Sequence, residues 1–280
     1  MVSVPASTPD PDTIAFIGGG NMASAIISGL LKQGLPASQI QIVEPWAEQR
    51  SKLATDFGIT AQAEPGAALT TAALVVWAVK PQTFRQAALQ TGPHTGQALH
   101  LSVAAGIRSD SMASWLGTQR IVRAMPNTPA LVGQGMTALF ARLAVSAADR
   151  LAVERVIQPT GELVWLDQEA QLDAVTALSG SGPAYVFYFL EAMVQAGSAM
   201  GLSREQAHQL AVQTFIGASA LAKASNEPPE ILRERVTSKG GTTYAALTAL
   251  EQSGVKQHFV QAMQAAYKRA SELGDEYGSS

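Results

Sequence analysis

Short apolar runs and helical patterns alternate along the first part of the chain. The apolar runs predict strands at 13–17, 40–44, 73–79, 98–103, 120–125, 136–141 and 162–166. Between them, apolar residues recur with the period of a helix, and we expect helices at 21–33, 47–57, 81–89, 109–115 and 147–158. Strands that alternate with helices in this way predict a parallel, doubly wound α/β sheet.

The pattern changes after about residue 167, where helical periodicity alone remains. The expected helices span 169–200, 204–224, 229–236, 242–251 and 255–277. The most apolar stretch, 184–200, is interrupted by Glu191, Gln195 and Gly197, and we interpret it as a buried helix rather than a membrane span. The chain is therefore divided into a disordered extension (1–11), an α/β domain (12–167) and a helical domain (168–280).

The helical domain is expected to leave apolar surface uncovered. Its apolar helix, 172–200, is long, and the domain around it is rich in alanine. Pairing with a second copy of the chain would bury the remaining surface, so we expect a homodimer. A self-contained helical bundle is the alternative.

Composition excludes several kinds of chemistry. The 280 residues contain no cysteine, which excludes disulfides, thiolate catalysis and zinc–thiolate sites, and we expect no metal. The net charge is −3 and no run of Lys or Arg occurs, so neither nucleic acid nor an anionic membrane is an expected partner. Residues 1–11 lack the basic and apolar regions of a secretion signal, and we expect a cytoplasmic protein.

The first predicted strand runs directly into a turn of three glycines. Gly18 permits the tight turn, Gly20 lets the backbone approach a pyrophosphate, and Ala23 is a small third residue where helix meets strand. The helix that follows offers free N–H groups to the phosphates, which assigns Asn21 and Met22 to the same site. The turn therefore predicts a Rossmann-type dinucleotide site; a strand–helix turn of another α/β fold is the alternative.

Glu44 strengthens this interpretation. It lies 21 positions after Ala23, at the end of the second predicted strand, close to the spacing expected for a residue that binds the ribose. Its carboxylate would accept a hydrogen bond from a ribose 2′-hydroxyl and repel a 2′-phosphate, which favours NADH. Arg50 could offset that repulsion if the helix brings it over the pocket. A solvated strand end is the alternative.

The segment VVWAVKP, 75–81, predicts a second wall of the cofactor site. An apolar strand ends on Ala78, and Pro81 begins a helix at its favoured first position. Because the carboxyl end of such a strand faces the cofactor, Ala78, Val79, Lys80 and Pro81 are assigned to cofactor binding. An exposed Lys80 without a function is the alternative for that residue.

The segment RAMPNTP, 123–129, ends another strand and continues into a loop stiffened by two prolines. In a sheet of this kind the loop lies beside the nicotinamide ring, and Met125, Pro126 and Asn127 are assigned there. A proline-stiffened connection without a ligand is the alternative.

Two further glycine motifs lie in the helical domain. In SGSGPAY, 179–185, two glycines and a proline interrupt a helical pattern and predict a kink, which exposes backbone groups to a ligand or admits another helix. In SKGGTT, 238–243, glycines precede a helix that begins with threonines, and the free N–H groups and hydroxyls predict an anion site. A carboxylate is the expected ligand, and an ordinary threonine N-cap is the alternative.

The sequence offers no obvious acid for the reduction of a carbonyl group. None of the four histidines falls in these motifs, and the long helix after Gly182 carries no lysine. A protonated imine accepts hydride without a strong acid from the enzyme, so the residues favour imine reduction over alcohol dehydrogenation.

These motifs together resemble a known family. The segments GGGNMA, VWAVKPQ, RAMPNTPALVGQGMTAL, ALSGSGPAYVF and VTSKGGTTYAAL occur in the order and spacing of Δ1-pyrroline-5-carboxylate reductases, and the resemblance extends from about residue 13 to about residue 273. It implies a Rossmann domain, a helical domain that interlocks with a second subunit, and dimers that assemble into larger rings, commonly decamers. The implied reaction is hydride transfer from NADPH or NADH to the imine carbon of 1-pyrroline-5-carboxylate, which yields L-proline in the last step of proline biosynthesis.

The resemblance also implies roles for residues of the SKGGTT segment. The substrate carboxylate would be bound by the Ser238 hydroxyl and the N–H groups of Gly240, Gly241 and Thr242. Thr243 would hydrogen-bond the ring nitrogen and relay the proton, with water as the alternative donor.

The chain departs from the family pattern at two positions. Lys239 stands where the family often has proline, and Glu44 stands where many members carry residues compatible with NADPH. The family therefore implies NADPH, whereas Glu44 favours NADH. Two other functions remain open: a β-hydroxyacid dehydrogenase, which would need a lysine on the long helix, and a non-catalytic NAD(P)-sensing protein, which would have no use for the anion site.

Overall fold

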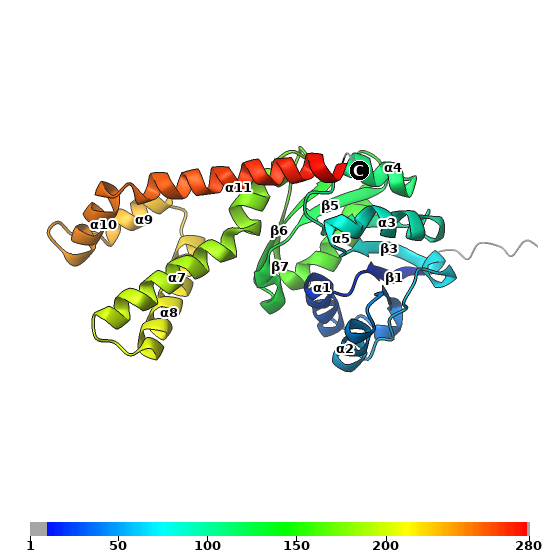
Figure 1. The fold of residues 1–280 in the computed structure, drawn as a ribbon, viewed down its shortest axis with the longest axis horizontal. Helices are drawn as coiled ribbons and strands as arrows, with labels where there is room; N and C mark the ends of the chain where they lie inside the picture. Colours follow the sequence, from blue (N-terminus) through cyan, green and yellow to red (C-terminus); the bar gives the residue numbers. More distant parts are fainter. Residues whose placement is uncertain (1–9, 279–280) are drawn as a thin grey trace, which may run out of the picture. The chain divides into compact units, whose positions relative to one another are not determined.

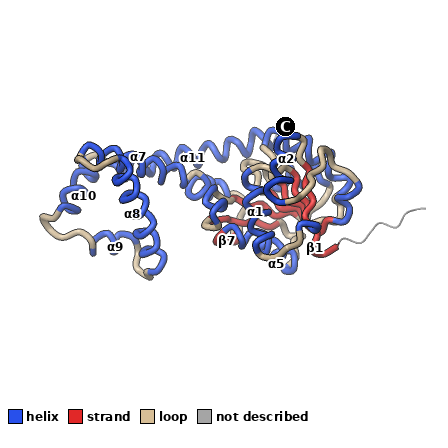
Figure 2. The backbone as a smooth tube through the Cα atoms, turned by 90° about the horizontal axis from the view of Figure 1, so that it is seen from below, coloured by secondary structure: helices blue, strands red, loops and turns tan. Residues whose placement is uncertain are grey.

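The computed structural model describes residues 10–278, which form two compact units. One unit contains the residues up to Ser181 together with those from Ala266 onward, and the other contains Gly182–Ala265. Strands occur only in the first unit among the described residues, whereas the second is built of helices (Figure 2). The predicted extension at 1–11 lies outside the described residues except for 10 and 11, which begin the first strand.

The first unit is a seven-stranded sheet covered by helices (Figure 1). Its strands are β1 (Asp10–Ile17), β2 (Ile40–Val43), β3 (Ala72–Trp77), β4 (Leu99–Ser102), β5 (Ile121–Met125), β6 (Gly135–Ala141) and β7 (Gly161–Trp165). Its helices are α1 (Asn21–Lys32), α2 (Ala47–Phe57), α3 (Pro81–Thr91), α4 (Ser109–Leu116), α5 (Ala147–Ile157) and α6 (Gln171–Val175). The strands and helices predicted for this part of the chain are confirmed, with ends that differ by at most three residues.

The strands lie in the order β2-β1-β3-β4-β5-β6-β7. Neighbouring strands pair in parallel except β5 and β6, which are antiparallel, so the predicted parallel sheet is confirmed apart from this one pair. The connection from Met125 to Gly135 contains only a short 3₁₀ turn, Thr128–Val132. Parallel strands require a longer crossover, so the next strand returns in the opposite direction.

Alternate residues of the central strands enter two separate cores. In β1, the Phe16 side chain packs in a cluster with residues of α1 and α5, whereas Ala15 and Ile17 pack with residues of α3 and α4. Helices therefore cover both faces of the sheet, and its central strands are buried, as is usual for strands joined by helical crossovers. The carboxyl ends of the strands are left open for a ligand at one edge.

The second unit contains α7 (Gly182–Ala199), α8 (Arg204–Ala224), α9 (Pro229–Arg235), α10 (Thr242–Gln252) and the first part of α11 (Val255–Gly278). Helices α7 and α8 pack against each other, where Gly197 lies against Ala207 and Val194 is buried. The prediction that 184–200 is a buried helix is wrong for the chain by itself, because only Val194 and Gly197 of α7 are buried. None of the described helices has the length and apolar character needed to cross a membrane.

The predicted interruption at 179–185 is confirmed. Helix α6 continues into a π-helical segment, Thr176–Gly180, in which the Ser181 N–H donates to the Thr176 carbonyl, and α7 begins only at Gly182. The widened turn brings Gly180 against Met125, whose Cε would lie 2.5 Å from a Cβ at this position. Gly180 therefore accommodates a side chain from the end of β5.

Candidate functional site

The glycine turn joins the end of β1 to the start of α1. Gly18 has a φ of +93°, and a Cβ there would lie 2.6 Å from the Ala78 carbonyl oxygen, so any larger residue collides with the strand end beside it. Gly20 is the N-cap of α1, and no atom lies within 4 Å of a Cβ placed on it. The backbone at Gly20 is therefore open to a ligand, as phosphate binding at a helix N-terminus requires.

The Glu44 side chain binds Gly19, the middle residue of this turn. Its Oε2 accepts a hydrogen bond from the Gly19 N–H at 2.9 Å, and its Oε1 accepts one from the Trp46 N–H at 3.0 Å. The Gly19 carbonyl accepts a hydrogen bond from the Gln49 side chain at 2.5 Å. The alternative of a merely solvated Glu44 is wrong, because the residue is 9% exposed and its carboxylate is bound to two backbone amides.

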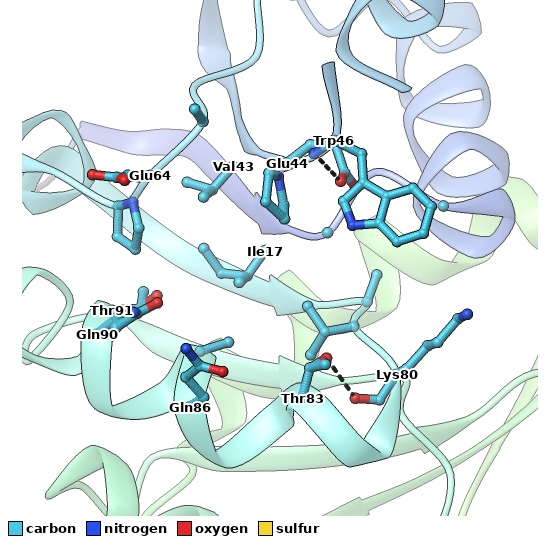
Figure 3. A pocket seen from close by; sticks show the side chains of 18 of the residues that line it. Ile17, Val43, Glu44, Trp46, Glu64, Lys80, Thr83, Gln86, Gln90 and Thr91 are labelled. Carbon is cyan, nitrogen blue, oxygen red and sulfur yellow. Dashed lines mark hydrogen bonds between the residues drawn. The ribbon is translucent and has the colours of Figure 1, made fainter. Parts of the chain in front are cut away.

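A cavity of about 960 Å³ opens at the carboxyl ends of β1, β2 and β3 (Figure 3). This volume is within the range of small-molecule and cofactor sites. Six residues assigned from the sequence line it, namely Gly18, Gly20, Glu44, Ala78, Val79 and Lys80. The other assigned cofactor residues are not among its described lining residues; they are Asn21, Met22, Pro81, Met125, Pro126 and Asn127.

The cavity also contains polar residues that the sequence reasoning missed. Thr83, Gln86 and Gln90 lie on one face of α3, at the spacing i, i+3 and i+7, and Glu64 and Trp46 lie on loops at the ends of the neighbouring strands. Their spacing places them on one face of a helix, but the sequence alone does not show that this face meets the cavity. Further lining residues include Pro45, Gln49, Pro65 and Thr91.

Polar groups from several elements contribute to the wall of the cavity. The Thr91 residue is fully buried, and its Oγ1 has no hydrogen-bond partner within the described part of the chain. Lys80 is exposed at the start of α3, where its carbonyl accepts hydrogen bonds from the N–H and hydroxyl of Thr83. The lining therefore combines glycine backbone, hydroxyl, amide and charged groups, a set that fits a dinucleotide.

The Met125–Asn127 segment is held by contacts to its own unit. The Asn127 side chain accepts a hydrogen bond from the Met136 N–H at 2.9 Å and donates one to the Ser179 carbonyl at 3.1 Å. Met125 packs on Gly180, as described above. These contacts join the end of β5 to the π-helical segment and fix the loop that the sequence places beside the nicotinamide.

An ion pair anchors the same strand. Arg123 is buried and donates to Glu169 at 2.7 Å, and the same carboxylate accepts hydrogen bonds from the Ser109 N–H and hydroxyl, each at 2.6 Å. Burial raises the pKa of the Glu169 carboxyl, but the Ser109 hydrogen bonds and the Arg123 charge outweigh it and hold the pKa below its ordinary value. Glu169 therefore stays ionised and ties the segment before α6 to β5 and α4.

The SKGGTT segment lies in the second unit, at the start of α10. Gly240 has a φ of +77°, Gly241 is the N-cap, and no side chain caps the helix start. The Gly241 N–H donates to the Ser238 carbonyl at 3.0 Å, so a carboxylate could bind this amide only by replacing that bond. Thr243 is half-buried, whereas Ser238 is exposed.

The fold and the cavity define a Rossmann-type dinucleotide-binding protein with a second, helical unit. Comparisons with known proteins narrow this class. The family model described as pyrroline-5-carboxylate reductase dimerisation matches residues 169–273, and the model described as NADP oxidoreductase, coenzyme F420-dependent, matches residues 13–106.

Relatives that match nearly the whole chain belong to the same class of enzyme. A pyrroline-5-carboxylate reductase from Pseudomonas aeruginosa is 46% identical over 97% of this chain and 99% of its own length. The structure of a pyrroline-5-carboxylate reductase from Coxiella burnetii superposes with a TM-score of 0.87 at 35% identity, over 94% of this chain and 99% of that one. A pyrroline carboxylate reductase from Plasmodium falciparum, solved with NADP bound, gives a TM-score of 0.85 at 27% identity, over 95% and 99% of the two chains.

The chain belongs to the pyrroline-5-carboxylate reductase family. The resemblance drawn from the sequence motifs is thereby confirmed. These relatives lend no support to the β-hydroxyacid dehydrogenase or the non-catalytic sensor that the sequence left open.

Proposed function

We propose that the protein reduces 1-pyrroline-5-carboxylate to L-proline, with NADH or NADPH as hydride donor, in the last step of proline biosynthesis. Membership of the family supports this reaction. The observation that carries it is the uncapped, glycine-preceded start of α10 with its threonines, because a dinucleotide cleft alone is common to many oxidoreductases.

The SKGGTT segment binds the substrate in this proposal. The Ser238 hydroxyl and the N–H groups of Gly240, Gly241 and Thr242 hold the carboxylate, which approaches the positive end of α10. No acidic residue lies in the first turn of this helix to oppose the anion. Binding at Gly241 replaces its hydrogen bond to the Ser238 carbonyl.

Thr243 binds the imine nitrogen of the substrate in this proposal. As the second residue of α10 it lies next to the carboxylate donors in sequence, and its hydroxyl donates a hydrogen bond to the ring nitrogen and relays the proton. The cofactor supplies the hydride at nicotinamide C4. The proton delivered to the nitrogen makes the imine carbon electrophilic for the hydride, so the chain needs to deliver this proton and to hold the ring in place.

The cavity of the first unit holds the cofactor. Gly18 and Gly20, which line the cavity, take the pyrophosphate together with Asn21 and Met22 at the start of α1. Ala78, Val79 and Lys80 form the wall at the end of β3, and Pro81 follows them as the first residue of α3. Met125, Pro126 and Asn127 border the nicotinamide. The hydrogen bonds of Asn127 to Met136 and Ser179 support this role, because they make the loop rigid.

The protein acts as a homo-oligomer in the cytoplasm, where it draws on the NADH or NADPH pool. The dimerisation family model supports self-association, and its match begins at residue 169, close to the boundary at 167 that we propose between the cofactor and dimerisation domains. The second unit buries few of its own apolar residues. Assembly of dimers into a decamer is the larger form that the family implies.

A single assay tests the reaction. The purified protein is mixed with 1-pyrroline-5-carboxylate and either NADH or NADPH, and loss of cofactor absorbance is followed together with proline formation. Absence of proline with both cofactors would contradict the proposal.

Thr243→Val tests the assigned catalytic residue. We expect turnover to fall by about 10²-fold, as for loss of a positioned proton relay, with unchanged affinity for the cofactor. Thr248→Val is the matched control, because Thr248 is a half-buried threonine of the same helix whose hydroxyl donates to the Tyr244 carbonyl. Weakened cofactor binding in Thr243→Val, or an equal loss of turnover in Thr248→Val, would remove Thr243 from this role.

A further inference from the structure

The Glu44 carboxylate is fixed on both of its oxygens. Oε2 accepts from the Gly19 N–H and Oε1 from the Trp46 N–H, and Figure 3 shows the second bond among the lining residues of the cavity. Only 9% of the residue is exposed. If the carboxylate moved aside, both amides would lose their acceptor.

The peptide that Glu44 holds is itself immobilised. The Gly19 carbonyl accepts from the Gln49 and Ser24 side chains, and a Cβ on Gly19 would lie 2.5 Å from Leu53. A shift of Gly19 toward a different acceptor therefore disturbs α1 and α2 as well. The negative charge stays at the end of β2, next to the pyrophosphate turn.

Glu44 forms no ion pair within the described part of the chain. Glu64 adds a second carboxylate to the cavity wall, and Figure 3 places it on the opposite side of the view from Lys80. Arg50 uses its Nη1 to donate to the backbone carbonyls of Glu44 and Pro45, at 3.0 and 2.6 Å. The guanidinium is thus bound to the outside of the strand end.

We propose that Glu44 makes this protein selective for NADH over NADPH. The proposal rests on the proposed use of a nicotinamide dinucleotide in this cavity. The fixed carboxylate accepts a hydrogen bond from the 2′-hydroxyl of the adenosine ribose, and it repels a 2′-phosphate that it cannot avoid by rotating away. The relative from Plasmodium falciparum was solved with NADP, so Glu44 gives this chain a preference that the family as a whole does not dictate.

The same carboxylate also shapes the glycine turn. Its bond to Gly19 occupies that amide and leaves the phosphates to the amides that follow at the start of α1. Charge and acceptor capacity are separable by substitution, because glutamine keeps one oxygen acceptor and removes the negative charge.

The test is calorimetric binding of NADH and NADPH to the full-length protein without substrate. The fragments 5′-AMP and adenosine 2′,5′-bisphosphate serve as probes of the adenosine end alone. We expect NADH to bind at least about tenfold more tightly than NADPH, and the difference to narrow at high salt, because the repulsion is electrostatic. In Glu44→Gln we expect the affinity for NADPH to rise about tenfold relative to the affinity for NADH.

Two further variants serve as controls for the role of Glu44. Glu48→Gln removes a carboxylate from the exposed first turn of α2, outside the cavity lining, and should leave the ratio of the two affinities unchanged. Arg50→Ala should leave it unchanged too. Selective loss of NADPH binding in Arg50→Ala would overturn the proposal, since Arg50 would then be the residue that binds the 2′-phosphate.

The remaining outcomes separate this proposal from the proposed function. Tighter binding of NADPH to the wild type, equal binding of both cofactors, or an unchanged ratio in Glu44→Gln would overturn the NADH preference while proline formation continued. Failure of both dinucleotides to bind would overturn the proposed function with it. Equal affinity of the wild type for 5′-AMP and adenosine 2′,5′-bisphosphate would also contradict a repulsion at the 2′-position.

Discussion

At the scale of single residues, Gly18 shows how local geometry limits the choice of side chain. Gly18 and Gly34 have nearly the same φ, +93° and +95°, but only Gly18 faces another chain segment, the Ala78 carbonyl. We expect Gly34→Ala to lower the free energy of unfolding by about 1 kcal/mol, the cost of a left-handed non-glycine residue. Gly18→Ala should cost more and abolish NADH binding. Denaturant unfolding and calorimetry measure both effects, and equal stability of the two variants would contradict the predicted collision.

His100 provides the pH dependence expected at this scale. It is fully buried and accepts a hydrogen bond at Nδ1 from the Trp77 indole at 3.0 Å, and burial lowers the pKa of His100 from 6.5 to about 4. Since the unfolded chain binds this proton below about pH 6.5 and the folded chain only below about 4, stability is lost as the pH falls between these values. The loss should reach about 3 kcal/mol.

Unfolding titrations between pH 7 and pH 4 test this prediction. His100→Asn, which keeps an acceptor for Trp77, should flatten that part of the profile, whereas His258→Asn on exposed α11 serves as the control. If the stability of the wild type depended on pH as weakly as that of His100→Asn, the lowered pKa of His100 would be contradicted.

The sequence was most informative about residues with a conformational or spacing signature. Gly18, Gly20 and Glu44 were found because a tight turn and a strand end have recognisable spacings. Trp46 and Gln86 were missed, because nothing in a single sequence distinguishes an exposed aromatic or a helix-surface glutamine at a cavity from one in solvent. Which face of α3 meets the cavity depends on tertiary packing.

At the scale of elements, periodicity located the helices and strands but not the direction of β6. The two cores separate because apolar residues alternate along buried strands, a pattern that sequence reports directly. The antiparallel pairing of β5 and β6 follows from the length and content of a loop, which a strand pattern does not contain. The contact of Met125 with Gly180 of the π-helical segment likewise joins residues far apart in the chain, which periodicity does not report.

The Arg123–Glu169 pair should stabilise the junction of β5, α4 and the segment before α6. Glu169→Gln leaves the buried Arg123 without its opposite charge, and we expect a loss of about 2 kcal/mol in the free energy of unfolding. Because the pKa of Glu169 is lowered in the folded state, this stabilisation is present near neutral pH and fades as the pH falls through that lowered pKa. Chemical denaturation at neutral and acidic pH measures it.

The exposed Arg269–Glu276 pair of α11 is the matched control for that experiment. Water screens both of its charges, so Glu276→Gln should produce no measurable change. A loss in Glu276→Gln as large as that in Glu169→Gln would mean that removal of any glutamate charge, rather than the buried contact, is responsible.

At the scale of the whole molecule, the second unit leaves many of its apolar side chains exposed. Its buried apolar cluster consists of Val194, Ala207 and Ala211, while large apolar side chains remain exposed along α7 and α8. They include Phe187, Tyr188, Leu210, Ile216 and Leu221. An apolar surface of this extent is typical of an interface, and the match to a dimerisation family model supports a second copy as the occupant.

Self-association should therefore be required for stability. We expect the wild type to have the mass of a dimer or of a multiple of it in sedimentation, with a Tm that rises with protein concentration. Ile216→Glu places a charge on the exposed face of α8 and should shift the mass toward the monomer and lower the Tm. Leu89→Glu, which alters an equally exposed residue of α3 in the cofactor-binding unit (both are 55% exposed), should change neither. A monomeric wild type at micromolar concentration, with a Tm independent of concentration, would mean that the apolar faces of α7 and α8 are not covered by a second copy.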